Sequence, residues 1–81
     1  MQIKTLFFAS YRDLLGISDL MLVLPEGSTV ADAVQAVRAR GGAFAVLPTD
    51  PAVAVNQTYT ASHGALSDGD EVAFIPPVAG G

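Results

Sequence analysis

Few side chains in this 81-residue chain could carry catalysis. Cysteine is absent, which excludes disulfides, thiolate metal sites and a cysteine nucleophile. His63 is the single histidine, and it has Ser62 beside it but no acid at a spacing that indicates a catalytic triad, so we expect a surface turn there. Asp68-Gly69-Asp70 matches only part of a calcium-binding loop, and we interpret it as a turn. No set of side chains assembles an active site.

The chemistry that remains belongs to the C-terminal carboxylate in IPPVAGG. A carboxylate is inert towards nucleophiles until it is activated, for example as an acyl-adenylate that sulfur can then capture. Pro76 and Pro77 form a semi-rigid extended segment, and Gly80 and Gly81 lack the Cβ that would keep a backbone carbonyl out of a narrow pocket. From Pro76 the segment reaches roughly 18–20 Å at about 3.3 Å per residue. The pattern indicates a tail that enters a pocket of a partner protein and is modified there at Gly81.

Composition narrows the function classes. Hydrophobic residues make up 51% of the chain and charged residues 15%, against about 25% in ordinary domains, so we expect an apolar surface for a partner. The net charge of −4, with four basic residues, argues against nucleic acid. No apolar run approaches the roughly 18 residues of a membrane helix, and no export leader is recognisable. We therefore expect a soluble, cytoplasmic protein without a membrane or metal partner.

Hydrophobic periodicity predicts strands at 2–9, 20–24, 52–56 and 71–75, with 58–61 as a candidate short strand. Ser10 is predicted to cap a short helix that Gly16 ends. A longer helix, capped by Ser28 or Thr29, carries an apolar stripe and ends near Gly41-Gly42. The segment 43–47 is open between a helical turn and a loop. This order predicts an α+β fold in which a mixed sheet packs on one main helix.

The two faces of the predicted sheet both carry apolar residues. Strand alternation places one set toward the helix, namely Ile3, Phe7, Val72 and Phe74. The opposite face receives Leu6, Phe8, Ala73 and Ile75, although a solvated face should alternate with polar residues more cleanly. Scattered exposed apolar residues are the alternative, because they are common on protein surfaces. We favour a contiguous docking patch. For Arg38 and Arg40, in the last turn of the longer helix, we expect only complementation of the helix dipole on a solvated face.

Three segments carry a family resemblance: LFFASYRDLLG, AVNQT and LSDGDEVAFIPPVAGG. Together the chain resembles the MoaD family of ubiquitin-like sulfur carriers, the small subunits of molybdopterin synthase. The resemblance spans nearly the whole length, and DGDEVAF-x-PPV-x-GG is its most specific part. It implies a β-grasp, ubiquitin-like fold over residues 1–75, followed by a flexible tail over residues 76–81 that ends in Gly-Gly.

The resemblance also implies a reaction cycle. In that family an ATP-using activating enzyme adenylates the terminal glycine, Gly81 here with Gly80 before it, and the glycine then becomes a thiocarboxylate. The tail enters the large synthase subunit, where sulfur passes to cyclic pyranopterin monophosphate to build the molybdopterin dithiolene. The family complex is a heterotetramer of two small and two large subunits. The small subunit binds no cofactor or metal of its own, and ATP belongs to the activating enzyme. It is the non-catalytic, sulfur-donating subunit of a sulfurtransferase and has no active site of its own.

By position the resemblance implies a set of partner-binding residues on the sheet and tail: Phe8, Tyr59, Ile75, Pro76, Pro77, Val78 and Ala79. Ile75 stands where an aromatic residue is common in the family, and Ala79 where threonine or serine is common. Two other functions are compatible with a C-terminal Gly-Gly. The first is a sulfur carrier for thiamine, amino-acid or tRNA sulfuration. The second is a ubiquitin-like protein modifier or a plain interaction module. With Lys4 as its only lysine, the chain is poorly suited to self-linked polymers.

Overall fold

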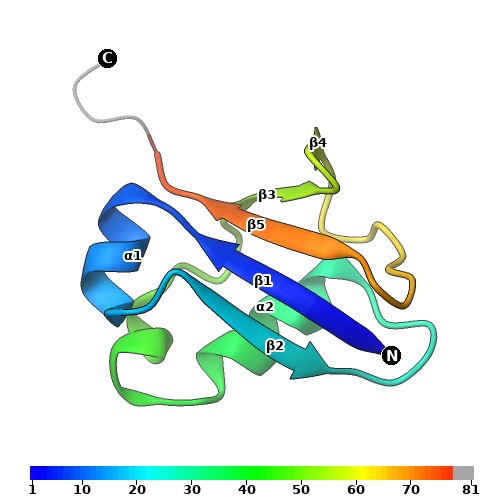
Figure 1. Cartoon of the computed structure of the whole chain (residues 1–81), viewed down its shortest axis with the longest axis horizontal. Coiled ribbons are helices and arrows are strands. Elements are labelled where there is room, and N and C mark those ends of the chain that lie inside the picture. The colour runs from blue at the N-terminus through cyan, green and yellow to red at the C-terminus, as the bar shows by residue number, and fades with distance from the viewer. Residues whose placement is uncertain (78–81) are drawn as a thin grey trace.

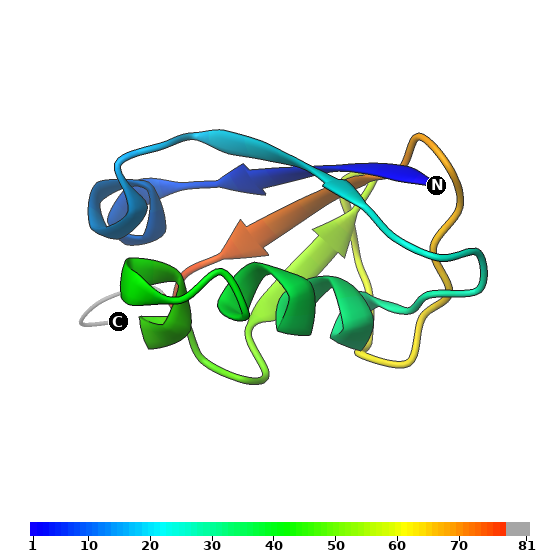
Figure 2. The same cartoon turned by 90° about the horizontal axis from the view of Figure 1, so that it is seen from below.

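In residues 1–77, which the computed structural model describes, five strands form one mixed sheet and a helix packs across one face of it (Figures 1 and 2). The elements follow one another as β1 (Gln2–Phe7), α1 (Ala9–Leu15), β2 (Asp19–Val23), α2 (Val30–Arg38), the 3₁₀ helix η1 (Gly42–Val46), β3 (Ala52–Val55), β4 (Thr58–Tyr59) and β5 (Glu71–Ile75). The predicted α+β class is confirmed. The ambiguous segment 43–47 is mostly η1, and the short strand predicted at 58–61 covers only two residues.

The strands lie in the order β2-β1-β5-β3-β4. β1 and β5 are parallel neighbours in the middle of the sheet, and the other pairs are antiparallel. The first and last strands of the chain therefore lie side by side, as Figure 1 shows for the blue and orange arrows. A mixed sheet with parallel terminal strands at its centre and one helix across it is the β-grasp arrangement.

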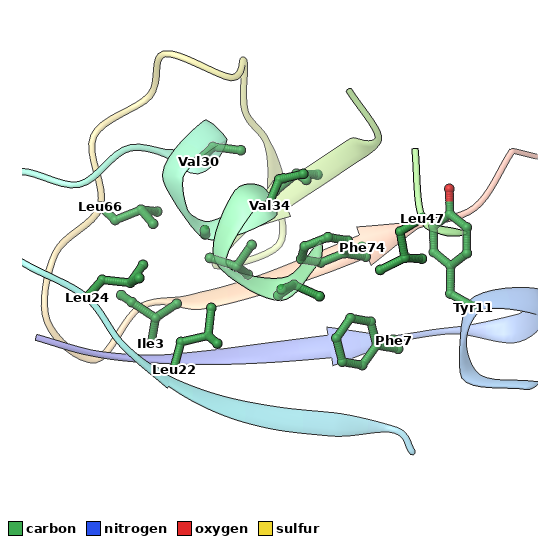
Figure 3. Close-up of a cluster of buried hydrophobic side chains, with 14 residues drawn as sticks. Ile3, Phe7, Tyr11, Leu22, Leu24, Val30, Val34, Leu47, Leu66 and Phe74 are labelled. Carbon is green, nitrogen blue, oxygen red and sulfur yellow. The ribbon is translucent and has the colours of Figure 1, made fainter. Parts of the chain in front are cut away.

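The core forms between the sheet and α2. Along β1, Ile3, Thr5 and Phe7 are buried while Gln2 and Lys4 are exposed, as a strand with one covered face requires. The predicted helical stripe is also buried, and it consists of Val30, Ala33, Val34 and Val37. Figure 3 shows Val30 and Val34 of this stripe facing side chains of the sheet, and all four residues belong to one core cluster. The rings of Phe7 and Phe74, on the adjacent strands β1 and β5, lie 5.3 Å apart between centroids.

Helix ends show where local prediction succeeds and where it fails. Thr29 is the N-cap of α2 and forms a capping box with Asp32, whose Oδ2 accepts a 2.9 Å hydrogen bond from the Thr29 backbone N–H. The prediction that Ser10 caps the first helix is wrong: the N-cap of α1 is Phe8, which offers no side-chain acceptor, and Ser10 lies inside the helix. The predicted stop at Gly16 is confirmed, because this residue takes the left-handed C-cap conformation.

The two arginines do more than complement the helix dipole. Arg38 is only half-exposed, and its Nε donates a 2.8 Å hydrogen bond to the Leu47 carbonyl that follows η1. Arg40 lies beyond the helix with its guanidinium 5.3 Å from the centre of the Phe44 ring. The expected complementation of the helix dipole fits Arg38, which lies in the last turn of α2, whereas Arg40 lies beyond the helix; both residues also attach η1 to the end of α2.

Within the described part of the chain, no helix is long and apolar enough to cross a membrane. The predicted domain of residues 1–75 ends where β5 ends. Of the predicted tail, Pro76 and Pro77 are described, and residues 78–81 lie outside the described residues, so the division into domain and tail stays a prediction.

Candidate docking surface

The face of the sheet that points away from α2 is lined by apolar residues in two rows. Strand register aligns Leu6, Ala73, Ala54 and Tyr59 across β1, β5, β3 and β4. The next row pairs Ile75 with Ala52. Phe8 extends this row, because its extended backbone continues the alternation after buried Phe7. We call these seven residues the outer face. The predicted sharing of one face by Leu6, Phe8, Ala73 and Ile75 is confirmed, whereas their docking role stays a prediction.

Large side chains border the outer face and alanines occupy its middle. Phe8 is 44% exposed and Tyr59 is 74% exposed, while Ala73 and Ala54 between them are buried. Large apolar side chains around a shallow centre are what a partner can cover with an apolar surface of its own. Phe8 and Ile75 lie at the ends of the neighbouring strands β1 and β5, and β5 is the strand that leads into the tail.

Tyr59 owes its position to the hairpin between β3 and β4. Val55 and Thr58 pair directly, which leaves a two-residue loop of Asn56 and Gln57, both with positive φ (49° and 71°). Positive φ at both positions defines a type I′ turn, the form that matches the twist of a hairpin. The short strand after this turn brings Tyr59 opposite Ala54 and so onto the outer face.

Asn56 also links two of the segments that carry the family resemblance. Its Oδ1 accepts a 3.0 Å hydrogen bond from the Glu71 backbone N–H, and its Nδ2 donates to Asp70 Oδ1 at 2.9 Å. Asp70 Oδ2 in turn accepts from the Ser67 backbone N–H at 2.8 Å, and Asp68 Oδ1 accepts from the Gln2 backbone N–H at 2.6 Å. These bonds fix the start of β5 against its neighbours. The turn interpretation of Asp68-Gly69-Asp70 is confirmed.

His63 lies in the surface turn that the sequence predicted. It is exposed, and the loop around it supplies carbonyls to the start of α2. The Ser62 carbonyl accepts from the Ala31 backbone N–H and the Gly64 carbonyl from the Val30 backbone N–H, both at 2.9 Å. Such bonds satisfy the free donors of a helix N-terminus. Among residues 1–77 no cluster of three or more histidine or acidic side chains could hold a metal ion.

A groove of about 400 Å³ lies where β5 ends and the tail begins. It is lined by Tyr11, Pro48, Asp50, Pro51, Ala52, Tyr59, Ile75, Pro76 and Pro77. Four of the predicted partner-binding residues, Tyr59, Ile75, Pro76 and Pro77, thus share one concave surface. Of the other three, Phe8 lies on the outer face and does not line this groove, while Val78 and Ala79 lie outside the described residues, as do Gly80 and Gly81.

The sequence analysis missed the residues that α1 and the η1–β3 connection contribute to this groove. The sequence placed Tyr11 in a helix and assigned it no role. In the structure, burial raises the pKa of its hydroxyl above the ordinary value of 10.0. Figure 3 shows the Tyr11 side chain beside Leu47, with its hydroxyl directed away from the core cluster. Pro48 and Pro51 were interpreted only as loop residues. No local pattern predicts that this loop meets the end of β5.

Comparison with known proteins agrees with this geometry. The model of the ThiS family matches residues 5–81, which is nearly the entire chain. The chain belongs to the ThiS family. A molybdopterin synthase sulfur carrier subunit of Escherichia coli (strain K12) is 43% identical over 81 residues, covering 98% of this chain and 99% of that protein. One from Arabidopsis thaliana is 34% identical over 80 residues, covering 99% of this chain and 83% of its relative. The family resemblance found in the sequence is confirmed.

Solved structures give the same fold. SAMP1 from Haloferax volcanii superimposes with a TM-score of 0.87 at 26% identity and full coverage of both chains. A putative molybdopterin converting factor subunit 1 from Pyrococcus furiosus gives 0.84 at 31% identity, covering 96% of this chain and 99% of the other. A chain from the complex of subunits 1 and 2 of the molybdopterin-converting factor of Helicobacter pylori gives 0.72 at 20% identity with full coverage, a likeness of fold alone. The ubiquitin-like β-grasp prediction is confirmed.

Proposed function

We propose that this chain is the sulfur carrier subunit of molybdopterin synthase and that Gly81 carries the sulfur. The observation that carries the proposal is the route of β5: this central strand leaves the sheet through Pro76 and Pro77, which line the groove together with Ile75 and Tyr59 of the outer face. Relatives of nearly full length, named as molybdopterin synthase sulfur carrier subunits, support the same pathway. Pro76 and Pro77 offer no backbone N–H to a neighbouring strand, so sheet pairing ends at Ile75.

The chemistry takes place at the carboxylate. An activating enzyme joins the Gly81 carboxylate to ATP, which gives an acyl-adenylate and releases pyrophosphate. A sulfur nucleophile then displaces AMP and leaves a thiocarboxylate. The sulfur bonds to cyclic pyranopterin monophosphate, and water then cleaves the bond between this sulfur and the glycine carbonyl carbon, which restores the carboxylate for another round. Two such transfers supply the two sulfur atoms of one dithiolene. ATP serves the activating enzyme, and this chain needs no cofactor or metal of its own. The use of ATP fits a cytoplasmic carrier.

The fold contributes position and recognition. The large synthase subunit covers the outer face, with Phe8, Tyr59 and Ile75 as the apolar contacts. Pro76 and Pro77 direct the tail into that subunit, and Val78 and Ala79 of the tail contact the passage that it enters. Gly80 and Gly81 lack side chains, so their backbone can approach a buried substrate closely. Two small and two large subunits form the proposed heterotetramer. The complex of subunits 1 and 2 named for the Helicobacter pylori converting factor is the kind of assembly that we propose.

The intact mass of the protein tests the proposal. The chain is incubated with a molybdopterin-pathway activating enzyme, ATP and a sulfur donor, and we expect the mass to rise by the replacement of one oxygen with sulfur. A variant that lacks Gly81 should show no gain while its circular dichroism and unfolding midpoint are unchanged. An established carrier in a parallel reaction verifies that the enzyme is active. An unchanged mass of the full chain in that experiment contradicts the proposal.

A protein modifier is the second candidate, because a structural neighbour at 26% identity is named small archaeal modifier protein 1. A modifier would pass its activated carboxyl group to a lysine of a target protein and form an isopeptide bond. Cells that express an epitope-tagged chain would then contain larger, tag-bearing conjugates that disappear when Gly81 is deleted. Their absence, together with the mass gain of the thiocarboxylate, would leave the sulfur carrier as the function.

A further inference from the structure

One edge of the sheet, strand β2, has an unpaired side. In the antiparallel ladder between β1 and β2, residues alternate between those that bond to the partner strand and those that point away. The hydrogen bonds from Phe7 N–H to the Ser18 carbonyl and from Leu24 N–H to the Met1 carbonyl show which residues of β2 bond to β1. Asp19, Met21 and Val23 therefore direct their backbone N–H and C=O groups away from β1.

Among the described residues, the part of this edge from Met21 to Val23 lacks the usual protection of an exposed strand. Natural edges carry lysine, proline or a bulge that prevents another strand from adding to them. In β2 the outward residues are one acid, Asp19, and two apolar side chains, Met21 at 56% and Val23 at 78% exposure. An extended peptide could bond to the free backbone and pack on these two side chains without meeting a barrier.

A groove continues from the end of β2. It has a volume of about 500 Å³ and is lined by Leu24, Pro25, Glu26, Gly27, Ser28, Asp32, Gln35, Ala36 and Ala39. Figure 2 shows α2 lying below β2, with the β2–α2 loop at one end. The side chains that α2 contributes at Ala36 and Ala39 are small, which leaves room for the apolar side chains of an added strand.

Charge indicates the kind of occupant. Both charged residues that line the groove, Glu26 and Asp32, are acidic, and Asp19 lies at the start of β2. The whole chain carries a net charge of −4, so a second copy would bring the same acidic groups and the same net charge to this edge. A partner with lysine or arginine next to its apolar residues complements the edge.

We propose that an extended segment of a partner protein, with alternating apolar residues and a basic end, adds to β2 as a further strand. Its apolar side chains nearest the end of β2 enter the groove between the β2–α2 loop and α2, and its basic end lies near Glu26 and Asp32. β2 and β4 are opposite ends of the sheet order, so this site and Tyr59 on the outer face are far apart across the strands. The site can be occupied while the tail is engaged, and it does not depend on the proposed function.

A synthetic peptide and backbone-resolved NMR test the inference. The probe is acetyl-Lys-Arg-Val-Thr-Val-Ile-Val-amide, titrated into the ¹⁵N-labelled full chain. We expect chemical-shift changes at the amides of Asp19–Val23 and at Ala36 and Ala39, and none at Phe8 or Tyr59. A peptide methylated on alternate backbone nitrogens cannot pair with the edge and should not bind. Replacement of Lys-Arg by Glu-Glu in the peptide should weaken binding.

Protein variants separate backbone pairing from the other contacts. Met21→Pro removes a backbone N–H that points away from β1 and breaks no hydrogen bond to β1. An edge strand tolerates proline at such a position. The substitution should lower the affinity for the peptide about tenfold or more. Met21→Thr keeps the N–H and serves as the matched control, with a smaller loss. Glu26→Lys should weaken the basic peptide by about two- to fivefold, the size of an exposed ion pair.

Three results would overturn the inference. They are the absence of any shift change along β2 with peptide in large excess, binding that moves the outer-face amides instead, and equal binding of the methylated peptide. If Met21→Pro does not fold, the methylated peptide still decides whether backbone pairing is required. Sedimentation of the free chain tests the other occupant, because concentration-dependent dimers that Met21→Pro abolishes would assign the edge to a second copy.

Discussion

Replacing Gln57 by glycine should stabilise the protein, because the type I′ turn holds this residue at a φ of 71°. The left-handed conformation costs an ordinary L-residue roughly 1–2 kcal/mol, whereas glycine adopts it freely. Part of that gain is lost, since glycine also makes the unfolded chain more flexible by about 0.4–1 kcal/mol. A net gain of about 0.5–1 kcal/mol remains, which corresponds to a rise in melting temperature of roughly 2–8 °C for a domain of this size.

Urea and thermal unfolding followed by circular dichroism measure this effect. Gln57→Ala is the matched control, because it removes the side chain and keeps the strained φ, so its stability should stay within about 0.5 kcal/mol of the parent. Asn56 remains unchanged in both variants, which preserves its bonds to Asp70 and Glu71. A midpoint for Gln57→Gly equal to or below that of Gln57→Ala would refute the argument from backbone strain.

Three further outcomes are expected. Gly80→Glu should abolish sulfur transfer in a single-turnover assay without lowering the melting temperature, and near-normal transfer would contradict a narrow passage for the tail. Phe8→Ala and Ile75→Ala should each weaken binding to the large subunit by about 1–2 kcal/mol with little loss of stability. Phe7→Ala, one residue away in the core, should instead lower the free energy of unfolding by about 3–5 kcal/mol. If the two faces were assigned wrongly, calorimetry would show the larger binding loss for Phe7→Ala and urea unfolding the larger stability loss for the other two variants. Burial raises the pKa of Tyr11 above its ordinary value of 10.0, so the unfolded chain loses the hydroxyl proton at a lower pH than the folded chain. The free energy of unfolding should therefore fall as the pH rises above 10.0. Tyr11→Phe should make the free energy of unfolding less dependent on pH in this range, and an unchanged dependence would count against a buried hydroxyl.

Periodicity was sufficient for most of the secondary structure, because strands and helices impose local repeats on buried residues. The strand predicted at 71–75 matches β5, and the stripe on α2 is buried as expected. The cap predicted at Ser10 failed for a local reason: the chain turns one residue after Phe8, where Ala9 has a φ of 46°. Nothing in the residue type of an alanine indicates a left-handed conformation.

Pairing between distant segments could not be read from local patterns. Alternation gave two faces for β1 and β5, but it did not show that these strands are parallel neighbours. The position of Phe8 and Ile75 on the outer face could be predicted because it follows from the alternation of each strand, whereas their docking role stays a prediction. Tyr11 and Pro51 join the groove only through tertiary packing. The tether between Arg38 and the Leu47 carbonyl likewise depends on where η1 folds back.

The central position of β5 also determines how the chain reaches its fold. β1–β2 and β3–β4 are pairs of strands near one another in sequence, and a two-stranded unit of this kind is marginal in water. β5 joins the two pairs, and its partner β1 lies at the other end of the chain, so a long loop must close before the sheet is continuous. Folding should therefore be a single, comparatively slow transition. Amide hydrogens of β1, β3 and β5 should exchange with one common opening free energy, because β1 and β3 are each left in only a marginal two-stranded pair when β5 leaves.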